Sequence, residues 1–219
     1  MDLETIYKNR FEQTGLQRRQ RVWKILCANF FQSYVREDAT ILDLACGYGE
    51  FINNIRAGVK YAVDLNPNAK EYLSHEVRFR LAPGNDLGVD DASLDAVFTS
   101  NFLEHLQTKE ECTSVLSEVF SKLKPGGRFL ILGPNIRYAY KEYWDYYDHY
   151  LALSHLSLTE ALRTTGYDVD HVVPRFLPYT MNNNIPAHPT LVRIYLKMPL
   201  AWRIVGKQFF VVARKPSEP

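Results

Sequence analysis

The stretch ILDLACGYG, residues 41–49, joins a short apolar run to a turn that contains two glycines. Its first five residues are typical of a strand buried on both faces of a sheet. Gly47 and Gly49 let the backbone of the turn approach a ligand closely, and the helix N-terminus that follows can hold a carboxylate. The next apolar run, YAVDL at 61–65, carries Asp64, which is placed to accept both hydroxyls of a ribose. Together these features predict a nucleoside-type cofactor beyond the carboxyl ends of parallel strands.

Short apolar runs alternate with helical stretches on the C-terminal side of this turn. Further strands are expected at 77–81, 94–100, 128–133, 167–173 and 208–215. Helices are expected at 16–36, at 103–123 and after a capping box of Ser157 and Glu160, the last ending at Gly166. Such alternation implies right-handed βαβ units, and the absence of an obvious crossover helix favours an antiparallel last strand.

The predicted architecture is α/β, with a single doubly wound Rossmann-like domain and a mostly parallel seven-stranded sheet. Residues 1–38 are expected to form an N-terminal helical cover, and residues 39–219 the cofactor-binding domain. Residues 181–206 are expected to be an insertion between the last two strands.

Bulk composition excludes several classes of protein. The 219 residues favour one domain, and the net charge of +1 shows no basic excess of the kind that nucleic-acid binders carry. Cys27, Cys46 and Cys112 form neither a zinc-ligand pattern nor a disulfide framework, so we expect buried thiols and no bound metal. The beginning of the chain has no apolar signal region, and no apolar run is long enough to span a bilayer, which together favour the cytoplasm.

The glycine turn by itself does not distinguish between nucleoside cofactors. The nicotinamide fingerprint has a third glycine near position 52, where this chain has Ile52, and this weakens a dehydrogenase interpretation. A tight turn with no ligand would leave Asp64 without an explanation.

Four segments in succession resemble the motifs of class I S-adenosylmethionine-dependent methyltransferases. They are ILDLACGYG, GNDL at 84–87, SLDAVFTSNFLEHL at 93–106 and KLKPGGRFLILGPN at 122–135. The resemblance covers residues 40–135 and extends more weakly to the C-terminus. It implies S-adenosylmethionine as the cofactor and S-adenosylhomocysteine as its product.

The resemblance also implies roles for individual residues. The methionine end of the cofactor would lie on the acidic-glycine loop, the ribose on an acid, the adenine between an apolar side chain and a second acid, and the sulfonium above an asparagine. The matching positions are, in that order, Asp43, Gly47 and Gly49; Asp64; Leu65, Asp86 and the amide of Leu87; and Asn101. Ala45 replaces the first glycine of the pattern, and its methyl group is a small intrusion, so we keep it among the cofactor-binding positions.

Methyl transfer requires alignment of donor and acceptor, exclusion of water and, for some acceptors, a base that removes a proton. A histidine is the usual base near neutral pH. His149, in the tract YWDYYDHY at 143–150, is the first candidate. His105, expected in the first turn of the helix after the fourth strand, is the second. Its alternative role is to orient Asn101 or Glu104.

The aromatic tract suggests the acceptor. Aromatic rings beside carboxylates suit a carbohydrate or another hydroxylated ring, and the candidate contacts are Tyr143, Trp144, Tyr147 and Asp148. The alternative is a surface helix whose tyrosines pack on the sheet edge. The segment 134–157, followed by PRFLPYT at 174–180, resembles small bacterial methyltransferases of polysaccharide, glycolipid or secondary-metabolite pathways.

These features predict O-methylation of a sugar hydroxyl on a glycan precursor or glycolipid. One alternative is O- or N-methylation of a small aromatic or antibiotic-like metabolite. Another is a non-catalytic module that binds S-adenosylmethionine.

Two peripheral segments carry further expectations. Arg10 is expected either to pair with the cofactor carboxylate or to be solvated, and Tyr7 and Phe11 lie beside it in the cover. Residues 190–207 combine apolar side chains with Arg193, Lys197, Arg203 and Lys207. That composition suits peripheral contact with an anionic membrane, or packing on the sheet or on a second subunit as a homodimer.

Overall fold

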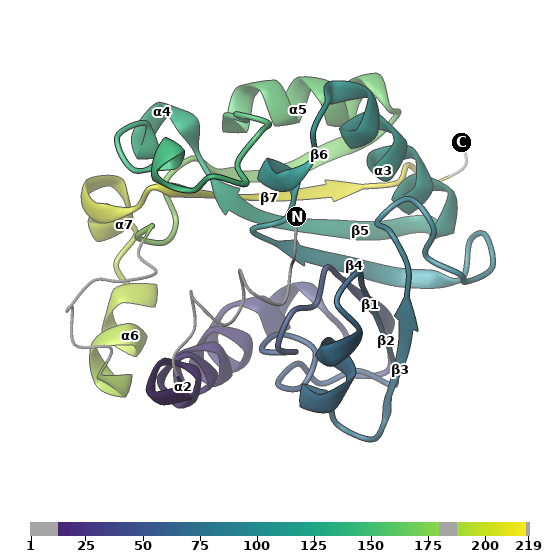
Figure 1. Ribbon diagram of the computed structural model, residues 1–219, viewed down its shortest axis with the longest axis horizontal. Helices are drawn as coiled ribbons and strands as arrows, with labels where there is room; N and C mark the ends of the chain where they lie inside the picture. The colour runs from purple at the N-terminus through teal and green to yellow at the C-terminus, as the bar shows by residue number, and fades with distance from the viewer. Residues whose placement is uncertain (1–12, 180–187, 218–219) are drawn as a thin grey trace.

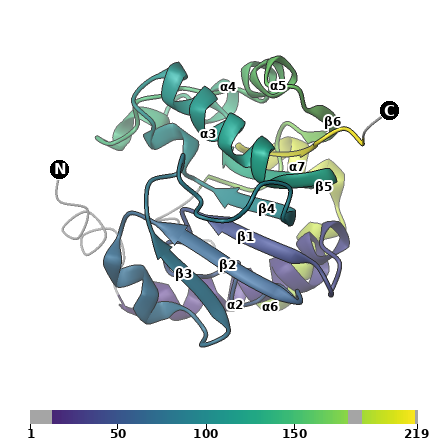
Figure 2. The same cartoon turned by 90° about the vertical axis from the view of Figure 1, so that its right-hand side faces the viewer.

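A computed structural model describes residues 13–179 and 188–217 of the chain. Seven strands form one sheet in the order β3-β2-β1-β4-β5-β7-β6. Figure 2 shows β3, β2, β1, β4 and β5 side by side in this order. Their bounds are Thr40–Leu44 (β1), Val59–Asp64 (β2), Val77–Leu81 (β3), Leu94–Ser100 (β4), Leu123–Pro134 (β5), Asp168–Val173 (β6) and Gln208–Arg214 (β7). Strands β1 to β5 are parallel to one another, and β7 is antiparallel to both β5 and β6. The predicted sheet and its antiparallel last strand are confirmed.

Helices cover both faces of the sheet (Figure 1). On one face lie α3 (Lys109–Lys122) and α5 (His155–Thr164), whose Val115, Leu116 and Leu158 pack in one apolar core. On the other lie α2 (Gln13–Asn29), the 3-10 turn η1 (Phe31–Tyr34), α6 (Pro189–Leu196) and α7 (Pro199–Val205). Each face of the sheet therefore has its own core, as expected for a doubly wound fold.

Phe31 lies at the centre of the second core. Its side chain is completely buried. Its ring packs within 6.2 Å, centroid to centroid, of six other aromatic rings. These rings include Trp23 from α2, Phe98 from β4 and Phe210 from β7. A single side chain thus joins the N-terminal helix to the middle and the end of the sheet.

Strand β1 creates the switch point of the sheet. It pairs with β2 on one side and with β4 on the other, so the chain leaves β1 in one direction and returns on its opposite side. Ligands of open α/β sheets bind in the crevice beyond the carboxyl ends of the strands at such a point. The turn after β1 and the segment after β4 border that crevice.

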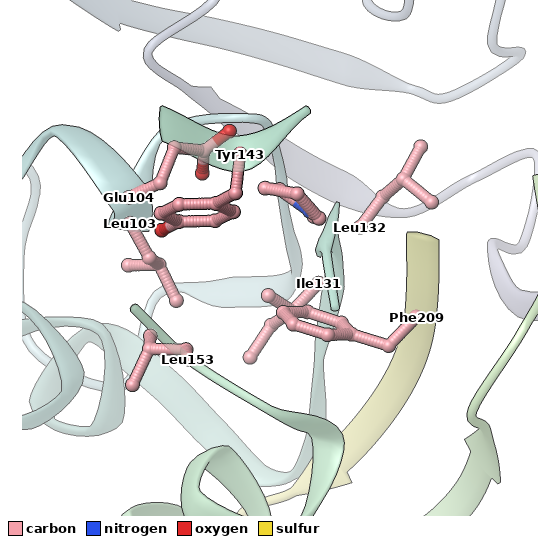
Figure 3. Close-up of a pocket in the computed structure, with 9 residues that line it drawn as sticks. Leu103, Glu104, Ile131, Leu132, Tyr143, Leu153 and Phe209 are labelled. Atoms are coloured by element: carbon pink, nitrogen blue, oxygen red, sulfur yellow. The ribbon is translucent and has the colours of Figure 1, made fainter. Parts of the chain in front are cut away.

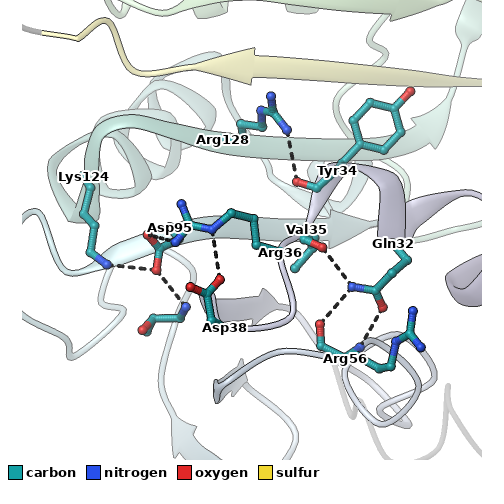
Figure 4. A network of polar contacts seen from close by, with 10 residues as sticks. Gln32, Tyr34, Val35, Arg36, Asp38, Arg56, Asp95, Lys124 and Arg128 are labelled. Carbon is teal, nitrogen blue, oxygen red and sulfur yellow. Dashed lines mark hydrogen bonds and ion pairs between the residues drawn. The ribbon is translucent and has the colours of Figure 1, made fainter.

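A polar network closes the opposite end of the strands (Figure 4). Asp95 accepts hydrogen bonds from the backbone of Thr40 at 2.8 Å and from Lys124 Nζ at 2.9 Å. Gln32 donates to the carbonyls of Val35 and Arg56 at 2.8 and 3.0 Å. These contacts hold η1 and the starts of β1 and β4 together, on the side away from the crevice.

Three expected helices differ from those observed. The helix expected directly after the glycine turn is absent, because residues 50–55 form turns and a bend. The segment 103–123 is not one helix, because Thr108 caps the N-terminus of α3 and accepts a hydrogen bond from the Glu111 amide at 3.1 Å. A separate 3-10 turn, η3 (Leu103–His105), precedes it, so His105 lies outside the helix. Likewise, the helix expected at 16–36 ends at Asn29 and is followed by η1.

The capping box of α5 also lies three residues earlier than predicted. Ser154 is the N-cap, and its side chain and that of Ser157 bond reciprocally to each other's backbone amides. Glu160 has no part in it. The pattern of a small hydroxyl residue three positions before a partner occurs twice here, and the helix begins at the first.

The described part of the insertion, from His188, forms α6 and α7. Their inner side packs in the second core through Val192, Leu196 and Trp202. The Trp202 indole donates to the Tyr195 carbonyl at 2.7 Å, and the Tyr195 hydroxyl donates to the Phe176 carbonyl at 2.5 Å. Among the described residues, no helix has the length and apolar character needed to cross a bilayer.

Candidate functional site

The turn after β1 has the geometry of a ligand cradle. Ala45, Gly47 and Gly49 all have positive φ, at 58°, 52° and 68°. At Gly47, an added Cβ would meet no other atom within 4 Å, so space lies open above the turn. Ala45 adopts the left-handed conformation that glycine would take more easily, which explains why the motif usually has a glycine there.

Asp64 closes the turn from β2. Its carboxylate accepts hydrogen bonds from the amides of Gly47 and Asn66, both at 2.8 Å. Burial raises the pKa of Asp64, and the hydrogen bonds partly oppose this. The acid therefore shapes the turn, and its role in binding a ribose stays a prediction.

Asp43 lies beneath the turn rather than on its surface. Its side chain is buried, and burial raises its pKa well above the ordinary value, with the nearby Glu50 acting in the same direction. The backbone of Ile52 bonds to its carboxyl group. These contacts suit a residue that supports the turn, and its role toward the methionine end stays a prediction.

Helix α2 is tied to the same turn by residues that sequence reasoning missed. Arg19 of α2 forms an ion pair with Glu50 at 2.9 Å, and its guanidinium lies 5.1 Å from the centre of the Tyr48 ring. Periodicity revealed the helix, but no local signal related Arg19 to a residue thirty-one positions away. Tyr7, Arg10 and Phe11 lie outside the described residues.

The expected adenine-binding residues fall into two groups. Leu65 is an apolar side chain that is 56% exposed beside a buried acid, which is the surface an adenine ring would cover. Asp86 pairs with Arg80 at 2.5 Å and is half exposed. Leu87, in contrast, is buried, and its amide donates to Glu118 Oε1 at 3.1 Å. Recognition of adenine through that amide would require this hydrogen bond to be exchanged.

The segment after β4 supplies the second side of the crevice. Asn101 has a φ of 51°, and its amide donates to the Leu132 carbonyl at 2.9 Å. Its side chain accepts from Ser100 Oγ at 3.0 Å and hydrogen-bonds to Glu104. This strained conformation directs Asn101 and Glu104 to the carboxyl end of β4.

Glu104 is a buried acid that sequence reasoning named only as a partner of His105. Its residue is 3% exposed, and burial raises the pKa of its carboxyl group. The side chain lines a small cavity with apolar residues, and Figure 3 shows its carboxylate beside the ring of Tyr143. The signal that could have found it is the acid directly before His105, at a strand end that borders the crevice.

His105 and Asp148 form a pair across the site. His105 Nδ1 lies 2.9 Å from the Asp148 carbonyl oxygen and 3.2 Å from its carboxylate. Burial lowers the pKa of His105, but Asp148 and Glu104 outweigh that effect, and the net shift is upward. The amides of Tyr150 and Leu151 both donate to the Glu104 carbonyl, at 2.9 and 3.1 Å. These contacts fasten the aromatic tract to η3.

The aromatic tract is divided between the interior and the surface. Tyr143 is completely buried, and its hydroxyl donates to the Leu151 carbonyl at 2.5 Å, so this ring supports the fold in the described arrangement. Trp144 and Tyr147 are 59% and 87% exposed. His149 is buried among aromatic rings, and its ring centre is 5.0 Å from that of His105.

The structure thus brings His105, His149 and Asp148 together, with Asn101 and Glu104 on the same strand end. Trp144 and Tyr147 point outward from the tract beside them. The turn residues and Asp64 form the other half of the crevice.

Comparisons with known proteins show which proteins this chain resembles. Residues 42–131 match the family model described as a methyltransferase domain. A protein of Mycolicibacterium smegmatis, named as a probable S-adenosylmethionine-dependent methyltransferase, is 28% identical over 144 residues. That alignment covers 62% of this chain and 54% of the relative, so the match spans about half of the relative's length.

Solved structures share the fold over nearly the whole chain. A SAM-dependent methyltransferase from Archaeoglobus fulgidus has a TM-score of 0.68 at 19% identity, covering 98% of this chain and 100% of the other. The complex of the Haloferax volcanii Trm112 methyltransferase activator with a candidate methyltransferase gives a TM-score of 0.70 at 21% identity, covering 94% and 95%.

The open glycine turn and the exposed Leu65 beside Asp64 form a surface that suits a nucleoside-type cofactor. The matched family model describes a methyltransferase domain, which is consistent with such a cofactor. Residues 42–131 therefore match a methyltransferase domain, and the chain is similar to S-adenosylmethionine-dependent methyltransferases in sequence and in fold, which makes S-adenosylmethionine the cofactor expected at this turn.

Proposed function

We propose that this chain methylates an oxygen of a hydroxylated acceptor, and that the acceptor is a sugar hydroxyl on a glycan precursor or glycolipid. The observation that carries the proposal is the His105–Asp148 pair, which lies beside Asn101 at the end of β4. An alkyl hydroxyl needs a proton acceptor when its oxygen is methylated, and an oriented imidazole supplies one.

The chain's own residues divide the work of the reaction. The bound cofactor supplies an activated methyl group on its sulfonium. Asp148 holds Nδ1 of His105 and so leaves Nε2 directed at the acceptor proton. The side chain of His105 is 29% exposed, whereas residue His149 is only 6% exposed, so we assign the base role to His105 and a supporting role to His149.

The acceptor class is supported by the exposed part of the aromatic tract. Trp144 and Tyr147 present large ring faces next to Asp145 and Asp148, and sugars bind proteins through such stacking and carboxylate hydrogen bonds. The three cysteines are buried free thiols, which suits action in the reducing cytoplasm, where glycan precursors are assembled.

A methyl-transfer assay tests the acceptor. S-adenosylhomocysteine formation is measured with nucleotide sugars, lipid-linked glycans and phenolic metabolites as separate acceptor sets. We expect turnover with the sugar-containing sets. Turnover with phenols only would favour the small aromatic metabolite, and cofactor binding without turnover in any set would favour a non-catalytic module.

Asp64→Ala is expected to weaken binding of S-adenosylmethionine by about 1–3 kcal/mol, because hydrogen bonds to a charged carboxylate are lost. Isothermal titration calorimetry measures the affinity. The amides of Gly47 and Asn66 also lose their acceptor, so circular dichroism of the unbound variant is recorded alongside. Asp90→Ala, at an exposed acid outside the crevice, is the matched control and should bind as the wild type does. Equal affinity of the Asp64 variant would remove the ribose-binding role.

The outer side of α6 and α7 supports a second part of the proposal, contact with an anionic membrane. Six apolar side chains of this surface are 47–74% exposed: Leu191, Ile194, Met198, Leu200, Ile204 and Val205. Arg193, Lys197 and Arg203 are exposed between them. No acid of the described residues forms an ion pair with these three cations. An apolar surface with unpaired cations suits the interface of an acidic bilayer, where a lipid-linked acceptor would lie.

Sedimentation with vesicles that contain acidic lipid tests this contact. We expect the wild type to sediment with the vesicles and the variant with Arg193, Lys197 and Arg203 changed to Glu to remain in solution. The control is a variant with Arg163 changed to Glu, because Arg163 is an exposed position of α5, which lies on the opposite face of the sheet. Negligible sedimentation of all three proteins would leave packing against a second subunit as the role of the surface.

A further inference from the structure

Three side chains at the end of β4 bring metal-binding atoms together. One ligand atom each from Glu104, His105 and His149 lies within 4.8 Å of the other two. Zinc bonds to such atoms are about 2.0–2.2 Å long, so small side-chain rotations would bring all three onto one ion. Two of the residues come from η3 and the third from the aromatic tract, which the Glu104 carbonyl fastens in place.

Glu104 is expensive to bury without a partner of opposite charge. Among the described residues, no hydrogen bond reaches its Oε1 atom. Its neighbours in the small cavity, including Leu103, Ile131 and Phe209, are apolar (Figure 3). A buried carboxylate in apolar surroundings is destabilising unless it is protonated, paired or bound to a metal.

His105 has the second hydrogen bond that metal-binding histidines commonly have. Its Nδ1 contacts both the carbonyl and the carboxylate of Asp148. In metal sites, a carboxylate or carbonyl on one ring nitrogen fixes the orientation of the imidazole and leaves the other nitrogen as the ligand. The Asp148 contact therefore leaves Nε2 of His105 available as a metal ligand.

His149 completes the set from the opposite side. It is buried, its ring is stacked on Tyr146 at 4.9 Å, and its edge faces His105. A neutral imidazole is the form that binds metals. Two imidazoles and one carboxylate are the donor set of many catalytic zinc sites, in which a fourth position stays open.

We propose that Glu104, His105 and His149 form a binding site for a divalent transition-metal ion, with Zn²⁺ the best match, and that Asp148 orients His105 within it. The binding claim does not depend on the proposed reaction. Its catalytic consequence does: if the acceptor is a hydroxyl, the open position would receive its oxygen and lower its pKa, as zinc does for water. The ion would then assist the proton removal otherwise assigned to His105.

Calorimetric titration of metal-free protein with Zn²⁺ tests the site without any acceptor or cofactor. We expect one ion per chain for the wild type. Glu104→Gln and His149→Ala should weaken binding by at least about 100-fold, and Asp148→Asn by about 10–100-fold, the range for partners of the ligands. His75→Ala is the matched control, because the His75 side chain is 99% exposed and far from the strand end in sequence. It should bind as the wild type does.

A second measurement keeps the proposal testable if a variant folds poorly. Co²⁺ added to the metal-free wild type should give the ligand-field absorption of a four- or five-coordinate ion, and Zn²⁺ should displace it. Absence of one-to-one binding, or equal binding by the wild type and the folded Glu104 and His149 variants, would overturn the proposal as adventitious binding. Neither outcome would contradict the proposed methyl transfer, and failure of the methyl-transfer assay would not contradict metal binding in the titration.

Discussion

His105→Ala is expected to lower kcat for methyl transfer by roughly 10²–10⁴-fold, the contribution of a positioned acid or base. The side chain lies at the end of β4, and Asp148 holds its Nδ1 at 2.9 and 3.2 Å. Since neither His105 nor Asp148 belongs to the turn after β1, the affinity of the variant for S-adenosylmethionine should stay close to that of the wild type. Steady-state kinetics with the best acceptor, and calorimetry with the cofactor, measure the two quantities.

The companion variants distinguish between the histidines. His149→Ala should also lower kcat, because His149 packs against His105 and the tract, and the larger loss identifies the base. The exposed His75→Ala variant is expected to be fully active. Full activity of both the His105 and His149 variants would show that positioning of the acceptor suffices. Loss of cofactor affinity would instead indicate that the crevice had been disturbed.

Phe31→Ala is expected to lower the free energy of unfolding by about 3–5 kcal/mol, the usual cost of truncating a fully buried phenylalanine. The ring contacts aromatic side chains of α2, β4 and β7, so its loss leaves a cavity where three parts of the chain meet. Urea denaturation followed by circular dichroism measures the change.

Tyr147→Ala provides the comparison for that measurement. The Tyr147 side chain is 87% exposed, and surface substitutions of this kind usually change stability by no more than about 0.5 kcal/mol. Similar losses for the two variants would mean that the second core does not depend on Phe31.

Local sequence signals sufficed for the sheet. Strand β1 and its neighbours are short, apolar and bounded by turns. The turn after β1 was recognisable because it contains Gly47 and Gly49, which both have positive φ. The antiparallel β7 was also predicted, because the sequence shows no obvious crossover helix between β6 and β7, although α6 and α7 lie between them and pack on the second core. These features depend on neighbours within a few residues.

The predicted helix boundaries that were wrong lie where two local signals could each begin the helix. Leu103 and Leu106 have helical spacing with α3, but the hydroxyl of Thr108 ends that continuity by capping a new helix. Ser154 and Ser157 both have a partner three residues later, and the helix begins after the first. Neither choice is visible in a hydrophobic pattern.

The site shows the same limit at the level of single side chains. Tyr143 and Trp144 are adjacent aromatic residues, yet one is buried and the other mostly exposed. Their order along the chain has no period that assigns a face, so only the contact of the Tyr143 hydroxyl with Leu151 decides it. In the same way, the pairing of Leu87 with Glu118 joins residues thirty-one positions apart.

The attachment of the Tyr150 and Leu151 amides to the Glu104 carbonyl has a consequence for how this protein can diverge. These backbone hydrogen bonds fix the distance between η3, which carries His105, and the tract that carries Asp148. Trp144 and Tyr147 belong to the same tract, but their side chains are mostly exposed and contribute little to the core. Their identities can therefore change by mutation while the reactive groups keep their spacing, which makes this short tract a natural position for exchanging one acceptor preference for another.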